Sequence, residues 1–513
     1  MRLMAADAQN TATDQPVRAP RGLVLSCKGW QQEAVLRMLL NSLDPEVAER
    51  PQDLVICGAA GKATANWKSF RSIVASLRQL AGDESLIVES GQPAGVFRTN
   101  RLSPRVLLTR AAGNEVCGDW LYAGTQSALP VLYELYAAAA RRHFDGTLAG
   151  KLVIGGGLGG AGGAQPLAAM LNGAAFLGID ADAERIKRRV KTGYCEVMVN
   201  HLDEALRILK NAVRQRAAVS AGLIGNCADV FPELARRGVV PDLLTDHTPA
   251  EAPFDGYVPL GFTPDSAADA RHADADAFRQ RVLESAGIHL RGMRELERLG
   301  ARVITWRDDI ALRINMAEGR DVAVAAGQPG AGDTHSFLNS RDYLRPLADE
   351  GRRLITCLAL SGEPGDIARA DRLALEAFSG DERVTRWIAL ASKYVRFQGL
   401  PARVAWLRDR ELGTFGLALN DLVARGEIKG PILLGCRFAL PESSRDAPIR
   451  DGKALLEDMS STESGACWVW FGGGAGPGEL RQVTAQAFVA DGTADAGERI
   501  ARWIANGADP KTA

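Results

Sequence analysis

A glycine-rich segment, GLGGAG at 157–162, fits the pattern GxGxxG and lies between an apolar run, 152–154, and an expected helix that begins near Ala164. In this context glycines permit a tight turn and a close approach of the backbone to a ligand, and the free N–H groups at the start of the helix can hold a pyrophosphate. The partner of the ribose should be an acid about 20 residues further on, at the end of the next strand. Asp180 stands there, and an acid at this place favours a free 2′-hydroxyl. The pattern therefore predicts binding of NAD in preference to NADP.

The segments around this turn alternate between strands and helices. From Leu129 the pattern predicts a helix, the strand KLVIGG, the glycine turn with its helix, and the strand AAFLGID. Helices from Ala183 and Asp203, the strand SAGLIG, another helix and the strand DLLTD follow. An alanine- and aspartate-rich stretch, 266–277, is typical of a solvated loop or a helix start. This alternation predicts an α/β fold with a parallel sheet and right-handed crossovers.

The flanking regions are organised differently. Apolar residues have helical spacing at 29–43, and 54–67 has the pattern of a short buried strand, a glycine turn and a helix. A third region with a new succession of elements begins near Pro329. It contains the segment GAGDTHSF, amphipathic stretches at 371–397 and 413–425, and a glycine-rich segment at 471–479.

Composition restricts the class of protein. A chain of 513 residues predicts two or three domains, and 46% hydrophobic with 24% charged residues is typical of globular proteins. The net charge of −1 gives no electrostatic reason to expect nucleic acid or an anionic membrane as partner, so we expect a small molecule. The eight cysteines are scattered without a CxxC pair, which predicts reduced thiols and neither a metal site nor a disulfide framework. Residues 1–21 lack an apolar signal segment, and the chain lacks a membrane-length apolar run, so we expect a cytoplasmic protein with a disordered N-terminal tail.

Five longer segments together resemble the urocanases, over a region from about Cys27 to near Thr493. They are CKGWQQEAVLRMLLNSLDPEVAERPQDLV, SGQPAGVFRTN, GGGLGGAGGAQPLAAMLNG, GNCADVFPELARRGVVPD and FQGLPARVAWL. The resemblance implies a homodimer with a Rossmann-like NAD domain inserted between N- and C-terminal segments. We therefore expect a tail at 1–21, an N-terminal domain at 22–127, the NAD domain at 128–330 and a C-terminal domain at 331–513. It also implies tightly bound NAD⁺ that acts as an electrophile towards the substrate imidazole, with no net hydride transfer.

The same resemblance implies which residues contact the cofactor. Asp180 occupies a position where the family has Glu, and Cys227 one where it has Ala. The expected contacts are Gly58, Ala59, Asn114, Gly157, Gly159, Gly160, Ala161, Gly162, Asp180, Arg185, Asn226, Cys227, His247, Thr248, Tyr257, Val258, Trp306 and Gly473.

The positions that would handle the substrate differ from the family pattern. Cys57 replaces a tyrosine, Thr356 replaces an arginine, Ala405 replaces a cysteine, and Phe438 lies in a segment where the family has a histidine and an aspartate.

New ionisable groups have appeared elsewhere, and they are our candidates for proton transfer: His247, Glu251, Asp308 and Asp309. Protonation of a carbon and activation of water both need titratable groups within hydrogen-bond reach. The alternatives stay open, because His247 could bond the cofactor amide or the backbone, and paired aspartates often cap a helix or face solvent. Arg403 is a candidate for the substrate carboxylate, with Arg307 and Arg437 as alternatives.

These changes point to a modified substrate. The expected function is hydration of a urocanate with a sulfur substituent on the ring, S-methylthiourocanate or thiourocanate, formed in the breakdown of thiohistidine betaines such as ergothioneine. An alternative in the same class is a urocanate hydratase of histidine degradation. An alternative of another class is a catalytically silent NAD-binding paralogue, although new ionisable residues are not typical of a decayed site.

Overall fold

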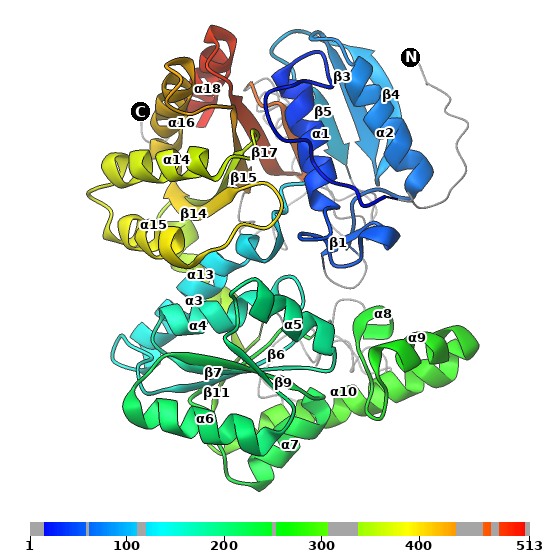
Figure 1. Ribbon diagram of the computed structural model, residues 1–513, viewed down its shortest axis with the longest axis vertical. Helices are drawn as coiled ribbons and strands as arrows, with labels where there is room; N and C mark the ends of the chain where they lie inside the picture. Colours follow the sequence, from blue (N-terminus) through cyan, green and yellow to red (C-terminus); the bar gives the residue numbers. More distant parts are fainter. Residues whose placement is uncertain are drawn as a thin grey trace, which may run out of the picture. The chain divides into compact units, whose positions relative to one another are not determined.

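The computed structural model describes residues 15–57, 61–109, 120–248, 253–305, 337–437, 465–472 and 482–507. The chain divides into two compact units, and each has its own hydrophobic core (Figure 1). Unit 1 combines the N-terminal part up to Ser127 with the C-terminal part from Leu347, and unit 2 is the intervening segment Ala128–Pro346. Unit 2 is thus an insertion between the two parts of unit 1.

Unit 2 is built on a parallel sheet. In the described residues the strand order is β12-β11-β10-β6-β7-β9-β8, and all neighbouring strands pair in parallel. All six residues of β7 are buried, as expected for a strand covered on both faces. The strands are β6 (Leu152–Gly156), β7 (Ala175–Asp180), β8 (Val197–Val199), β9 (Val219–Ile224), β10 (Leu243–Asp246), β11 (Arg302–Thr305) and β12 (Leu338–Asn339).

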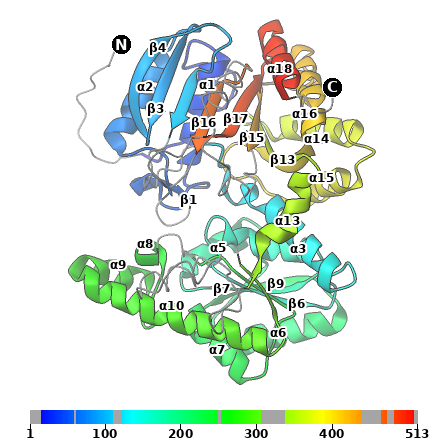
Figure 2. The same ribbon diagram turned by 180° about the vertical axis from the view of Figure 1, so that it is seen from behind.

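Helices cover both faces of this sheet, with α3, α4 and α5 on one side and α6, α7 and α10 on the other (Figure 1 and Figure 2). Each turns an apolar stripe to the strands, as α6 does with Ala205, Leu206, Leu209 and Ala212. The helices are α3 (Leu129–His143), α4 (Gln165–Leu171), α5 (Ala183–Lys191), α6 (Leu202–Gln215), α7 (Cys227–Arg236), α8 (Pro253–Gly256), α9 (Pro264–Ala273), α10 (Ala275–Arg298) and α13 (Ser340–Asp349). The expected α/β architecture with an inserted parallel-sheet unit is confirmed.

Two features of unit 2 went beyond the sequence pattern. The stretch 266–277 is helical, because Thr263 caps α9 through a capping box with Ser266, and Asp274 caps α10 by accepting from Ala277 N. Strand β8 was not predicted, since three residues that are only partly buried give no periodic signal.

Unit 1 has a mixed sheet with the order β14-β13-β15-β17-β16-β5-β3-β4 in the described residues. Strand β5 pairs in parallel with both β3 and β16, so it joins strands from the two ends of the chain. The strands are β3 (Glu84–Glu89), β4 (Gln92–Arg98), β5 (Val106–Thr109), β13 (Arg352–Ala359), β14 (Ala402–Arg408), β15 (Ile432–Arg437), β16 (Trp468–Gly472) and β17 (Gln482–Ala490), with a separate pair, β1 (Val55–Cys57) and β2 (Gly61–Lys62).

The helices of unit 1 are α1 (Trp30–Ser42), α2 (Trp67–Gln79), α14 (Pro364–Ala377), α15 (Glu382–Tyr394), α16 (Asp409–Ala424) and α18 (Ala494–Gly507). The amphipathic stretch 371–397 is interrupted between α14 and α15, where Asp381 caps the second helix by accepting from Val384 N. None of the described helices of the protein is both long and apolar enough to cross a membrane.

A buried ion pair in α1 holds the segment 22–27 of unit 1 against this helix. Glu33 and Arg37 have fully buried side chains, with Arg37 Nε 2.9 Å from Glu33 Oε1. Glu33 Oε2 also accepts from Ser26 N, Ser26 Oγ and Cys27 N, and Arg37 donates to the carbonyls of Gly22, Val24 and Leu360. Burial alone would raise the pKa of Glu33, but the bonds from Arg37 and Ser26 outweigh it and hold this pKa below its usual value.

This depressed pKa predicts a pH dependence of stability. The contribution of Glu33 is complete above the usual carboxyl pKa of about 4.3 and is lost as the pH falls through the lower folded-state pKa. We expect Glu33→Gln to lower the free energy of unfolding by about 2–3 kcal/mol near neutral pH, since bonds to a charged group are lost. That difference should shrink as the pH falls below about 4.3. Urea titrations over a pH series measure it, with Glu376→Gln on the exposed side of α14 as the control; a difference independent of pH would contradict the assignment.

Candidate active site

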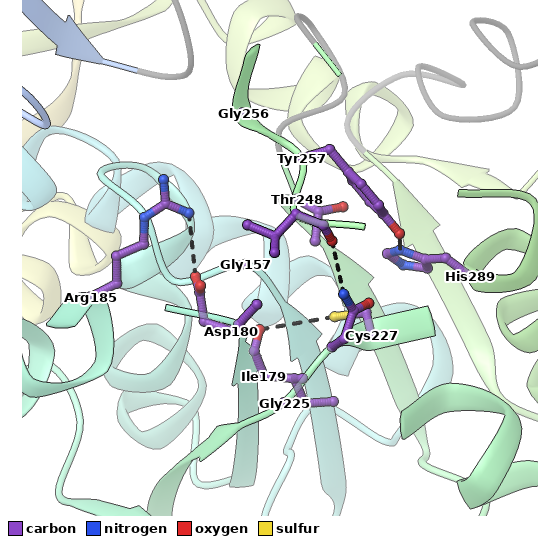
Figure 3. Close-up of a pocket in the computed structure, with 13 residues that line it drawn as sticks. Gly157, Ile179, Asp180, Arg185, Gly225, Cys227, Thr248, Gly256, Tyr257 and His289 are labelled. Atoms are coloured by element: carbon purple, nitrogen blue, oxygen red, sulfur yellow. Dashed lines mark hydrogen bonds and ion pairs between the residues drawn. The ribbon is translucent and has the colours of Figure 1, made fainter. Parts of the chain in front are cut away.

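A pocket lies at the carboxyl ends of the strands of unit 2. Chain order reverses between β6 and β10, because β7, β9 and β8 follow on one side of β6 and β10, β11 and β12 lie on the other. Open parallel sheets bind ligands at such a point. The lining residues are Gly157, Ile179, Asp180, Ala181, Arg185, Gly225, Asn226, Cys227, Thr248, Gly256, Tyr257, Val258 and His289 (Figure 3).

The glycine turn after β6 is required by the protein's own backbone. Gly157 has φ +74°, and a Cβ there would lie 2.5 Å from the carbonyl oxygen of His247, at the end of β10. A Cβ on Gly162 would lie 2.2 Å from the carbonyl oxygen of Gly157. Side chains at these positions would therefore push apart the loops that follow β6 and β10, and the pocket between the loops with them.

The side chain of Gln165 stabilises this turn by hydrogen bonds to its backbone. Gln165 is fully buried at the start of α4, and its amide donates to the carbonyl oxygens of Gly156 (3.2 Å) and Gly157 (3.0 Å). Its own oxygen accepts from Thr245 Oγ1 at 2.7 Å. The side chain thus satisfies polar groups of β6, the turn and β10 at once. Gln165 could not be recognised as a site residue from the sequence, because a glutamine at the start of a helix is not distinctive.

Asp180 is both a pocket residue and a support of the turn. Its Oδ2 accepts from Leu158 N at 2.7 Å and its Oδ1 from Asp182 N at 2.9 Å, with Arg185 Nη1 3.7 Å from Oδ2. Burial raises the pKa of this carboxyl, an effect that Arg185 and the two backbone donors oppose. The remaining lone pairs of Asp180 can accept from a ligand hydroxyl in the pocket.

Residues from the segments after β9, β10 and α8 line the side of the pocket opposite Asp180 and Arg185 (Figure 3). Asn226 caps α7 by accepting from Ala228 N (2.9 Å) and donates to the carbonyl of Val258 (2.8 Å), so it ties the loop after β9 to the segment after α8. Thr248 donates through its hydroxyl to Asp246 Oδ2 at 2.7 Å. Both side chains are thereby fixed before any ligand binds.

Close packing of α10 on α7 brings His289 to this pocket. A Cβ at Gly292 would lie 2.8 Å from Pro232 Cδ, so the helices approach closely only because residue 292 is a glycine. One turn earlier, the His289 ring lies 5.0 Å from the Phe231 ring, and its Nδ1 lies 3.3 Å from Tyr257 Oη (Figure 3). His289 could not be recognised as a site residue from the sequence, because a histidine inside an amphipathic helix has no distinguishing spacing.

Burial controls the titration of this group of side chains. It raises the pKa of Tyr257 well above its usual range, so the phenol stays protonated. It lowers the pKa of His289, with Asp246 acting in the opposite direction, and it lowers the pKa of His247 to about 3. Both imidazoles are therefore neutral at pH 7. An imidazole with a pKa near 3 is poorly matched to proton transfer at neutral pH, which favours the alternative in which His247 only forms hydrogen bonds.

Some expected site residues do not line the pocket, among them His247 after β10, and others fall outside the described residues. Gly159, Gly160, Ala161 and Gly162 belong to the turn but do not line the pocket. Those outside the described residues are Gly58, Ala59, Asn114, Glu251, Trp306, Asp308, Asp309 and Gly473.

Arg403 forms a buried ion pair inside unit 1. It lies in β14 of unit 1, where Nε and Nη2 donate to Asp371 at 3.0 and 2.8 Å, and both side chains are buried. Asp371 also accepts from Ser392 Oγ. The ion pair with Asp371 therefore supports β14 inside unit 1, and the expected contact of Arg403 with a substrate carboxylate stays a prediction.

The fold and the pocket define an α/β protein in which a Rossmann-like unit is inserted into a second, mixed-sheet unit. Comparison with protein families is consistent with this division. The urocanase N-terminal domain matches residues 17–122, the urocanase Rossmann-like domain 124–324 and the urocanase C-terminal domain 346–512. The chain belongs to the urocanase family, and it is a hydro-lyase of the urocanase type.

Proposed function

We propose that this hydratase binds NAD⁺ in the pocket of unit 2. The observation that supports the proposal is the convergence of expected cofactor contacts from four separate loops on one pocket at the carboxyl edge of the sheet. These residues are Gly157, Asp180, Arg185, Asn226, Cys227, Thr248, Tyr257 and Val258.

The residues present fit a dinucleotide. Gly157 of the glycine turn lines the pocket, and Asp180 accepts from a ribose hydroxyl while Arg185 lies beside it. Bound NAD⁺ supplies an electron-poor ring that accepts electron density from an imidazole. Tyr257 and His289 stay neutral, so both can take part in hydrogen bonds that orient a ligand.

We further propose that the substrate is a urocanate with a sulfur substituent on its ring, best S-methylthiourocanate, with thiourocanate next. The support lies in unit 1. At the positions where the resemblance implies an arginine and a thiol, β13 and β14 present Thr356 and Ala405, both buried and uncharged. A site that has lost charged and thiol groups suits a soft, weakly polar substituent better than the parent ring.

Ultraviolet absorbance of the purified protein with urocanate, thiourocanate and S-methylthiourocanate in turn tests the substrate. We expect kcat/KM for the methylthio compound to exceed that for urocanate by about 10–200-fold, the range that one small group supplies in a fitted pocket. The Asp180→Ala variant is the control, because loss of the cofactor should abolish turnover of every substrate. Equal kcat/KM values for urocanate and the methylthio compound would indicate that the protein is an ordinary urocanate hydratase. Absence of turnover with all three compounds would refute the proposed substrate class.

A further inference from the structure

Three buried side chains of unit 2 form a cluster at the edge of the cofactor pocket, and two of them, Cys227 and His289, also line that pocket. Cys227 begins α7, Asp246 ends β10 and His289 lies in α10, and a sulfur, an oxygen and a nitrogen atom from them all lie within 4.8 Å of one another. The three side chains are at most 9% exposed. We propose that this cluster is a binding site for one thiophilic divalent cation of the Zn²⁺ type, beside the cofactor pocket.

The distance between two of the ligands fits a metal better than a hydrogen bond. His289 Nε2 lies 3.6 Å from Asp246 Oδ2, beyond the usual 2.7–3.2 Å of an N–H···O bond. Two ligands of a tetrahedral zinc ion with ordinary bond lengths stand about 3.4 Å apart. The Cys227 sulfur lies within 4.8 Å of the other two ligand atoms, so it would have to move inward by at most roughly 1.3 Å to complete three corners of such a site.

The outer contacts of the cluster are those that metal ligands need. When His289 Nδ1–H donates to Tyr257 Oη, 3.3 Å away, Nε2 is left with a lone pair. Among the described residues this buried Nε2 has no hydrogen-bond partner, and it faces the carboxylate of Asp246. Thr248 donates to both oxygens of Asp246 and so fixes the carboxylate. Partners of this kind orient ligands and are typical of zinc sites.

Space and access also support a bound ion. A Cβ at Gly156 would lie 2.3 Å from Asp246 Oδ1 and 3.0 Å from Cys227 Sγ, so this glycine leaves room for the carboxylate and the thiol. Cys227 and His289 line the pocket, from which the ion would enter and towards which its fourth position would face. A donor set of sulfur, nitrogen and oxygen favours Zn²⁺ over Mg²⁺ or Ca²⁺, which prefer oxygen ligands. On binding, the Cys227 thiol loses its proton to solvent, and the thiolate and the Asp246 carboxylate together balance the charge of the ion.

Titration of the full-length, chelator-treated protein with Co²⁺ tests the site, because a bound thiolate gives cobalt a charge-transfer band in the near ultraviolet. We expect one equivalent of Co²⁺ to produce this band and Zn²⁺ to abolish it by displacement. Cys227→Ala should lose the band and weaken Zn²⁺ binding by at least about 100-fold, since loss of an outer partner alone costs 10–100-fold.

Cys195→Ala is the matched control, because Cys195 is another buried thiol of unit 2 that lies outside the cluster. It should keep the band. Cys227→Ser provides a variant of nearly unchanged volume should the alanine variant fail to fold, and circular dichroism verifies the fold of each. Wild-type protein without a sulfur–cobalt band, or an equal band in a folded Cys227 variant, would overturn the proposal.

Discussion

Replacement of Asp180 with alanine is expected to release NAD⁺ from the protein. The change removes the acceptor for a ribose hydroxyl, and it also leaves Leu158 N and Asp182 N without the partner that holds the glycine turn in place. Hydrogen bonds to a charged group contribute about 1.5–3 kcal/mol each, so we expect affinity to fall by about 10–100-fold. Calorimetric titration with NAD⁺, together with the nucleotide content of desalted protein, measures the loss.

The matched control is Asp182→Ala, two residues away. Asp182 caps α5 by accepting from Glu184 N, so its loss should reduce stability by about 1 kcal/mol and leave cofactor affinity close to that of the wild type. Full retention of NAD⁺ by a folded Asp180→Ala protein would mean that the pocket is not the cofactor site.

Replacement of Arg403 with methionine is expected to lower the free energy of unfolding by about 3–5 kcal/mol, because Asp371 would remain as a buried carboxylate without its partner. Urea-induced unfolding measures this effect. A loss of stability of this size would be unusual for a residue whose main role is to contact a substrate in an open site.

The double variant Arg403→Met with Asp371→Leu separates the two roles of Arg403. An apolar pair of similar volume often replaces a buried ion pair without loss, so stability should largely return. Turnover should return with it if Arg403 only supports β14. A stable double variant without activity would place Arg403 back among the residues that contact substrate.

Most of the fold could be predicted because its determinants are local. The helical spacing at 29–43 became α1, and the fully apolar run that ends at Asp180 became the buried strand β7. The division of 371–397 into α14 and α15 was less accessible, since it depends on the cap that Asp381 supplies to α15.

The site was predictable only in part. The structure brings some of the expected cofactor contacts, such as Gly157 and Asp180, to one pocket. These residues lie at the ends of consecutive strands, and parallel strands bring their carboxyl ends to one edge of the sheet. The ion pair of Arg403 could not be predicted from sequence, because Asp371 lies in a helix 32 residues away. His247 looked suitable for proton transfer until burial was known to lower its pKa to about 3.

The sequence by itself determined the family, the alternation of strands and helices, and the glycine turn with its acid, because those features depend on neighbours along the chain. Only the tertiary structure decided which ionisable groups are neutral, which charges are already paired, and that Cys227, Asp246 and His289 meet. The cysteine spacing had predicted no metal site, since spacing records ligands only when they lie in one local segment. The three side chains of the proposed site come from two helices and a strand, and the close approach of α10 to α7 at Gly292 brings His289 to the other two.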